Sequence, residues 1–312
     1  MLNWTPYPLF EDSSDFYPSY IASDRQGVWI ILADGGVAAR SKDDGATWQG
    51  ITLPAQVNTI DTNRLGVWIA VEDENICRSA DGGLTWSLVP HAMNSIKAIH
   101  CSPNGTWIAS GSGIWRSVDD GLTWQNVTPA VFHETSYGVA TDGNGVWIAT
   151  SRYNYQGFIY RSVDDGLNWT GHPVGESGSW LWTVFYGTDG VWLLVDYSNY
   201  EGQSCLRSSD NGISWSPVAS MAQNMYGLRF ATDGRGHWIG VENSNIHESY
   251  DNAATFTVKS YGDEAEPPQF SVGIATNSAG LWMIPLGYEG RVFISGGMQR
   301  FWGEYVNSVE VA

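Results

Sequence analysis

An eight-residue motif recurs along nearly the whole sequence and constrains its fold more than any other feature. In the copy SADGGLTW (residues 79–86), Ser79 and Asp81 can accept hydrogen bonds from backbone amides a few residues further on. Gly83 supplies the positive φ that a tight turn demands, and Trp86 brings a large apolar side chain to bury. Four more copies keep this pattern: SKDDGATW (41–48), SVDDGLTW (117–124), SVDDGLNW (162–169) and SSDNGISW (208–215).

Two further copies have diverged. SYDNAATF (249–256) has Ala253 in place of the glycine and Phe256 in place of the tryptophan, and SGGMQRFW (295–302) keeps only its first and last residues. A motif repeated at this spacing indicates one repeat architecture rather than several independent domains.

A second element, Gly-x-Trp followed by apolar residues, lies upstream of each copy and predicts a buried strand. Its tryptophans are Trp29, Trp68, Trp107, Trp147, Trp192, Trp238 and Trp282. A short strand with a polar turn precedes each, so every unit is expected to hold four strands, A to D. In one unit these are expected at 137–141, 146–151, 158–162 and 168–173.

Four short antiparallel strands in a unit of about 40–45 residues are typical of a propeller blade. We therefore predict an all-β fold, a single seven-bladed β-propeller over residues 1–312. LNWT at residues 2–5 repeats the LNWT of 167–170, which starts a D strand, so the N-terminal segment is expected to pair in the last blade. Residues 301–311 also align as a D strand and are expected to pair in the same blade. The predicted blades are 17–54, 55–90, 91–129, 130–174, 175–220, 221–260 and 261–312, with 1–16 as closure strand and lead-in.

The repeated motif resembles the Asp-box, or BNR repeat, of β-propeller proteins such as sialidases, xyloglucanases and sortilin-like receptors. The resemblance implies a fold rather than an activity. In that family the box lies on the outer turn of each blade. The A–B turns and the boxes are then expected on one face, called here the bottom face, and the B–C and D–A loops on the opposite, top face.

Sialidase activity is not expected, because the early Phe-Arg-Ile-Pro-like motif of that family is missing. The recurrent arginines precede the box serine and are expected to point to the rim: Arg40, Arg78, Arg116, Arg161 and Arg207. Xyloglucanases resemble two propellers facing each other across a cleft, and this chain supplies one. A glycoside hydrolase acting from the top face stays the alternative, since carboxyl groups are available there. They are Glu134, Glu176, Asp196, Glu201 and Glu289.

The net charge of −18, without a basic stretch, argues against nucleic-acid partners and against an anionic membrane surface. No segment has the features of a signal peptide or is apolar for long enough to span a bilayer. Cys77, Cys101 and Cys205 fall in predicted strands and are expected to be buried free thiols of a protein made in the cytoplasm. No metal site and no cofactor are predicted.

The top-face loops of blades four and five differ from the others in length and chemistry. SRYNYQG (151–157) and DYSNYEG (196–202) share a Tyr-x-Gly ending with the loop at 288–290. These residues suit either hairpin turns or contacts with a protein or sugar. The predicted ligand-binding residues are Tyr153, Tyr155, Tyr197, Tyr200, Trp180, Trp182 and Tyr288, with none predicted to be catalytic. We expect a non-catalytic module that binds a protein partner or a cell-surface glycan. By analogy, it is expected to belong to a larger assembly such as a phage tail or receptor-binding part.

Overall fold

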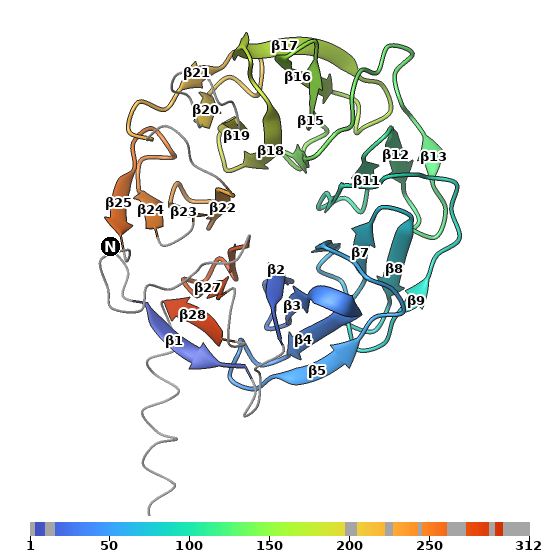
Figure 1. Cartoon of the computed structure of the whole chain (residues 1–312), viewed down its shortest axis with the longest axis vertical. Helices are drawn as coiled ribbons and strands as arrows, with labels where there is room; N and C mark the ends of the chain where they lie inside the picture. Colours follow the sequence, from blue (N-terminus) through green and yellow to red (C-terminus); the bar gives the residue numbers. More distant parts are fainter. Residues whose placement is uncertain are drawn as a thin grey trace, which may run out of the picture.

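The computed structural model confirms an all-β propeller (Figure 1). It describes residues 4–9, 16–196, 205–221, 227–242, 245–260, 273–286 and 291–295. These residues form seven antiparallel four-stranded sheets around a central axis. In the described part, a 3-10 turn at Asp34–Gly36 is the only helical element, and no helix is long and apolar enough to cross a membrane.

Each sheet runs from an inner strand at the axis to an outer strand at the rim. The first four sheets are β2 (Pro18–Ser23), β3 (Trp29–Ala33), β4 (Val37–Ser41) and β5 (Gln49–Thr52); β6 (Thr59–Thr62), β7 (Trp68–Glu72), β8 (Asn75–Ser79) and β9 (Ser87–Leu88); β10 (Ala98–Cys101), β11 (Trp107–Ser110), β12 (Ile114–Ser117) and β13 (Gln125–Asn126); β14 (Val139–Thr141), β15 (Trp147–Tyr153), β16 (Gln156–Ser162) and β17 (Thr170–Ser177). The last three are β18 (Leu181–Tyr186), β19 (Trp192–Asp196), β20 (Cys205–Ser208) and β21 (Ser216–Pro217); β22 (Arg229–Thr232), β23 (Trp238–Glu242), β24 (Asn245–Ser249) and β25 (Thr257–Ser260); β26 (Ala275–Thr276), β27 (Trp282–Pro285), β28 (Arg291–Ser295) and β1 (Thr5–Pro8).

The core lies between neighbouring sheets, and the Gly-x-Trp tryptophans fill it. All seven start the second strand of their sheet and are 0–1% exposed. We had expected the tryptophans of the eight-residue turns to be buried in the same way. This holds for Trp169, but Trp86 and Trp124 are only half-buried, because they precede short outer strands at the rim. The three cysteines are buried and form no disulfide.

The eight-residue turns bind their own backbone, as the sequence predicts. The Asp81 carboxylate accepts hydrogen bonds from the amides of Leu84 and Thr85 (3.0 and 2.9 Å) and from the Thr85 hydroxyl (2.6 Å). Ser79 Oγ accepts from the amide of Gly83, at 3.0 Å, where φ is 80°. Burial works to raise the pKa of Asp81, but these hydrogen bonds outweigh it and lower the pKa to about 2. The same contacts recur around Asp119, Asp164, Asp210 and Asp251.

The arginines before these turns join neighbouring blades. Arg116 Nε donates to the carbonyl oxygen of Asp165 in the next blade, at 2.8 Å, and its terminal nitrogen lies 3.1 Å from the Asp165 carboxylate. The other four make the equivalent bond to a carbonyl: Arg40 to Gly82, Arg78 to Asp120, Arg161 to Asn211 and Arg207 to Asn252. They therefore belong to the repeat, as expected, and stabilise it by linking consecutive turns.

The ring is closed by β1, which is the outer strand of the last sheet (Figure 1). It pairs antiparallel with β28, with Thr5 opposite Ile294 and Pro8 opposite Arg291. This confirms that the N-terminal segment pairs in the last blade. The predicted pairing of residues 301–311 lies outside the described residues.

Candidate functional site

The structure gathers aromatic side chains on the top face of blades four and five. They come from the B–C hairpin of β15 and β16, the loop entering β14, and the start of β18 with the residue before it. Trp182 stacks on Tyr137 with ring centroids 4.7 Å apart, and Trp180 meets Trp182 edge-on at 6.0 Å. His133 stacks on Tyr153 at 3.7 Å. We call this set the aromatic cluster: His133, Tyr137, Tyr153, Tyr155, Trp180 and Trp182.

Arg152 contacts two rings of the aromatic cluster, Trp180 and Tyr155. Its guanidinium carbon is 4.6 Å from the Trp180 ring centre and 5.8 Å from that of Tyr155, both within cation–π range. Its Nε donates to Glu134 Oε2 at 2.8 Å, so that the carboxylate holds the guanidinium in place. Arg152 lies inside the SRYNYQG loop, but nothing in the sequence distinguished it from a solvated side chain.

Buried polar groups fix the segments that carry these rings. Asp196 is 3% exposed, and its Oδ1 accepts from the backbone amide of Trp180 at 2.8 Å. Tyr160, also buried, accepts from the amide of His133 at 2.7 Å, and Ser151 Oγ donates to the carbonyl oxygen of Glu134 at 2.8 Å. The rings are therefore presented by a rigid scaffold, with Tyr153 44% and Tyr155 75% exposed.

Four of the predicted binding residues thus belong to the aromatic cluster: Tyr153, Tyr155, Trp180 and Trp182. The other three, Tyr197, Tyr200 and Tyr288, lie outside the described residues. Of the carboxyl groups considered for hydrolysis, Glu134 is paired with Arg152 and Asp196 is buried against the Trp180 amide. Glu201 and Glu289 lie outside the described part, and the side chain of Glu176 is not described.

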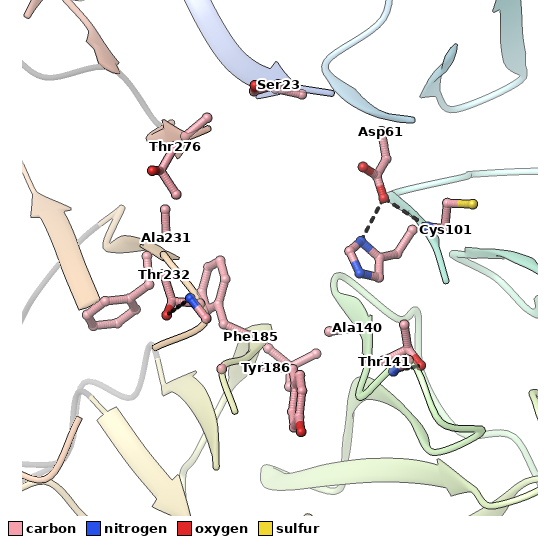
Figure 2. A pocket seen from close by; sticks show the side chains of 18 of the residues that line it. Ser23, Asp61, Cys101, Ala140, Thr141, Phe185, Tyr186, Ala231, Thr232 and Thr276 are labelled. Atoms are coloured by element: carbon pink, nitrogen blue, oxygen red, sulfur yellow. Dashed lines mark hydrogen bonds and ion pairs between the residues drawn. The ribbon is translucent and has the colours of Figure 1, made fainter. Parts of the chain in front are cut away.

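Apart from the aromatic cluster, the structure has a cavity of about 370 Å³ along the central axis. All seven inner strands contribute to its wall. Figure 2 shows side chains from successive blades around it, including Ser23, Thr141, Tyr186, Thr232 and Thr276. The aromatic cluster is not part of this wall.

The carboxylate of Asp61 contacts the imidazole of His100 in this axial cavity. Asp61 Oδ2 lies 2.8 Å from His100 Nδ1 and accepts from the amide of Cys101 at 2.8 Å, as the dashed lines in Figure 2 show. Burial alone would raise the pKa of Asp61, but His100 and the backbone amides outweigh it and lower the pKa. Across the described residues, no group of three or more His, Cys, Asp or Glu side chains is placed to hold a metal ion.

Comparison with known proteins establishes similarity at the level of the fold. The sequence matches no protein-family model and no curated protein. Among solved structures, it is similar to YCF48 bound to a D1 peptide, with a TM-score of 0.68 and 17% identity over 94% of this chain and 97% of that one. Virginiamycin B lyase from Staphylococcus aureus has a TM-score of 0.72 and 14% identity, over 96% of this chain and all of the lyase. The GH74 xyloglucanase from Xanthomonas campestris has a TM-score of 0.69 and 13% identity, over 96% of this chain and 54% of the enzyme. A peptide-bound protein, a lyase and a hydrolase thus share this propeller.

Proposed function

We propose that this protein is a non-catalytic binding module that takes up a protein partner on the aromatic cluster of blades four and five. The observation that carries the proposal is the arginine held by Glu134 against Trp180, with exposed tyrosines around it. Trp, Tyr and Arg are the residues that dominate binding energy at protein interfaces. Tyrosine and tryptophan lose little rotamer entropy on binding, and this backbone is already fixed by Asp196 and Tyr160.

Two further observations support a binder over a hydrolase. Of the top-face carboxyl groups considered for hydrolysis, the two whose side chains are described are engaged, Glu134 with Arg152 and Asp196 with a backbone amide, whereas glycoside hydrolysis needs a pair free to exchange protons. The similar structure of YCF48 was solved with a bound peptide, so a propeller of this shape can bind a polypeptide.

We further propose that the eight-residue turns are Asp-box turns, given the recurrent serine and aspartate contacts with their own backbone. The place in a virion or larger assembly expected from the sequence stays a prediction. Mass spectrometry of the native assembly tests it, and recovery of this chain only as a free monomer would contradict it.

The binding proposal is tested with Tyr155→Ala and Trp180→Ala against Tyr17→Ala. Tyr17, 45% exposed just before β2, is a matched aromatic control in another blade. Candidates captured by the immobilised parent protein are purified, and their affinities for the three variants are measured. We expect each cluster variant to weaken binding about 30-fold, corresponding to roughly 2 kcal/mol, with Tyr17→Ala unchanged.

The proposal is wrong if the cluster variants bind the purified partner as tightly as the parent does. A glycan array run with the same proteins distinguishes the ligand class. If the parent protein binds a glycan and both cluster variants lose this binding, the ligand of the aromatic cluster is a sugar rather than a protein. Hydrolysis of a glycan by the parent protein would favour the enzyme instead.

A further inference from the structure

Two arginines line the axial cavity at equivalent positions in neighbouring blades. Arg25 is the second residue of the A–B turn DRQG (24–27), and Arg64 is the second residue of NRLG (63–66). The matching positions of blades three, four and six also line the cavity, but they hold Pro103, Gly143 and Gly234. Blades one and two therefore concentrate positive charge at one side of a cavity in a strongly acidic protein.

Both arginines are held in a backbone conformation that their side chains disfavour. Arg25 has φ 63° and Arg64 has φ 61°, in the left-handed region where Gly143 and Gly234 also lie. Asp24 Oδ1 fixes the first turn by accepting from the amides of Gln26 and Val28, at 2.7 and 2.9 Å. The conformation belongs to the repeated turn, since Ser278 at the matching position of blade seven shares it with φ 62°, so the turn fixes where each arginine starts.

The two turns are also joined to each other. Asn63 Oδ1 fixes the second turn by accepting from the amides of Leu65 and Val67, at 2.7 and 3.1 Å. The Gln26 side chain donates to the carbonyl oxygen of Arg64 and connects the two turns. The spacing of the two arginine backbones is therefore set before any ligand arrives.

Carboxylates near the two arginines oppose their charge without pairing with them, and Asp61 and Asp142 also line the cavity. In the described part of the chain, neither guanidinium forms an ion pair or a hydrogen bond, and the nearby Asp61 is engaged with His100 and the Cys101 amide. Arg25 is an exposed residue, but the cavity walls displace part of the water around it, and the like charge of Arg64 lies nearby. Desolvation first and repulsion by Arg64 second lower the pKa of Arg25 to about 10, although Asp61 and Asp233 oppose this.

We propose that the axial cavity binds a small ligand through an oxyanion group, a phosphate or a carboxylate, placed between Arg25 and Arg64. The planar guanidinium donates two parallel hydrogen bonds to either group. A cavity of about 370 Å³ has the size of small-molecule sites. This site is separate from the aromatic cluster, so it can hold or fail independently of the binding function proposed above.

Calorimetric titration of the full chain with inorganic phosphate and with citrate tests the site, using Arg25→Asn and Arg64→Asn. Asparagine tolerates the left-handed conformation, so both variants are expected to melt at or above the parent temperature. Each should weaken binding of the preferred probe roughly tenfold, and Arg64→Lys, which keeps the charge without the planar fork, should lie between. Phosphate preference would indicate a phosphorylated ligand, and citrate preference a carboxylate.

The matched control is Arg235→Gln. Arg235 belongs to the A–B turn of blade six, DGRG (233–236), but it does not line the cavity. It is expected to leave binding unchanged. The proposal is overturned if neither probe binds the parent protein, if the asparagine variants bind as the parent does, or if Arg235→Gln loses as much affinity as they do.

Discussion

The fourth residue of the eight-residue turn supplies the acceptor for a buried indole N–H in four blades. Asp44, Asp165, Asn211 and Asn252 occupy this position, and each accepts from the Gly-x-Trp tryptophan of its own blade at 2.8–3.1 Å. In blade two the position is Gly82, and Trp68 Nε1 is buried without a partner among the described residues. Trp107 Nε1 is also unpartnered, and the Asp120 of its blade accepts from Asn63 Nδ2 instead.

We predict that Gly82→Asp stabilises the protein by about 1 kcal/mol, because it supplies the missing acceptor for Trp68. A Cβ at Gly82, where φ is 73°, would lie 3.3 Å from the end of the flexible Arg40 side chain. Arg116 and Asp165 occupy the equivalent positions in blades three and four. Their pairing shows that an aspartate fits beside the arginine at this point of the repeat. Gly82→Ala is the control, since it adds the Cβ without an acceptor. Urea unfolding measures both, and equal midpoints for the two variants would contradict the argument.

Some residues of the candidate site can be recognised from the sequence alone, and others only from their contacts in the structure. Tyr153, Tyr155, Trp180 and Trp182 could be proposed from loop length and residue type. The role of Arg152 could not, because its contacts with Glu134 and Trp180 join residues 18 and 28 positions away. Arg25 and Arg64 carry a signal that was available, namely two arginines at one position of a repeated turn.

At the scale of strands, each blade uses its two tryptophan positions differently. The Gly-x-Trp residue starts a second strand that is covered by sheets on both sides, whereas the turn residue precedes an outer strand of as few as two residues. Composition cannot separate these positions, because both are aromatic residues at the start of a strand. Their burial follows from the place of the strand between axis and rim.

We expect Trp107→Ala to destabilise the protein by about 3–5 kcal/mol, because it empties a fully buried site. Trp124→Ala in the same blade should cost about 1–3 kcal/mol, since its ring is half-buried and its Nε1 donates to the carbonyl oxygen of Gly121 at 3.1 Å. Thermal melts of the pair measure the difference. An equal or larger loss for Trp124→Ala would show that the turn tryptophan carries the packing.

The four strands predicted for blade four are all present, with ends that differ by one or two residues in β14, β15 and β16 and by more in the outer strand. In blade four the outer strand was expected at 168–173, but β17 runs from Thr170 to Ser177. The register between β16 and β17 shifts between Gln156 and Phe158, which lets the outer strand continue beyond the usual length. A bulge of this kind depends on pairing partners distant in the sequence.

At the scale of the whole molecule, β1 covers the edge of the last sheet. Deleting residues 1–9 removes this strand and leaves β28 without an outer neighbour. We predict a lower melting temperature and aggregation, because an exposed strand edge pairs with other chains. Light scattering during a thermal melt measures both.

The matched comparison deletes residues 301–312, the other segment predicted for this edge. If that truncation aggregates while the protein lacking residues 1–9 stays a stable monomer, then the C-terminal segment closes the ring. The seven-bladed ring and the N-terminal closure could both be predicted, because the repeated LNWT is a local match. A choice between two competing segments is a matter of relative energy, which sequence similarity does not report.

Because β1 pairs with β28, the ring can close only after β28 has been synthesised. Thr5 leaves the ribosome well before its partner Ile294. At about 5–20 residues per second, the roughly 290 residues between them take on the order of 15–60 seconds to make. Throughout that time the first strand has no native neighbour. Pro6 and Pro8 give it a backbone that lacks amide hydrogens at alternate positions, so one of its two edges cannot donate to a stray strand. Until β28 is made, β1 is thus protected along one edge against pairing with the wrong strand.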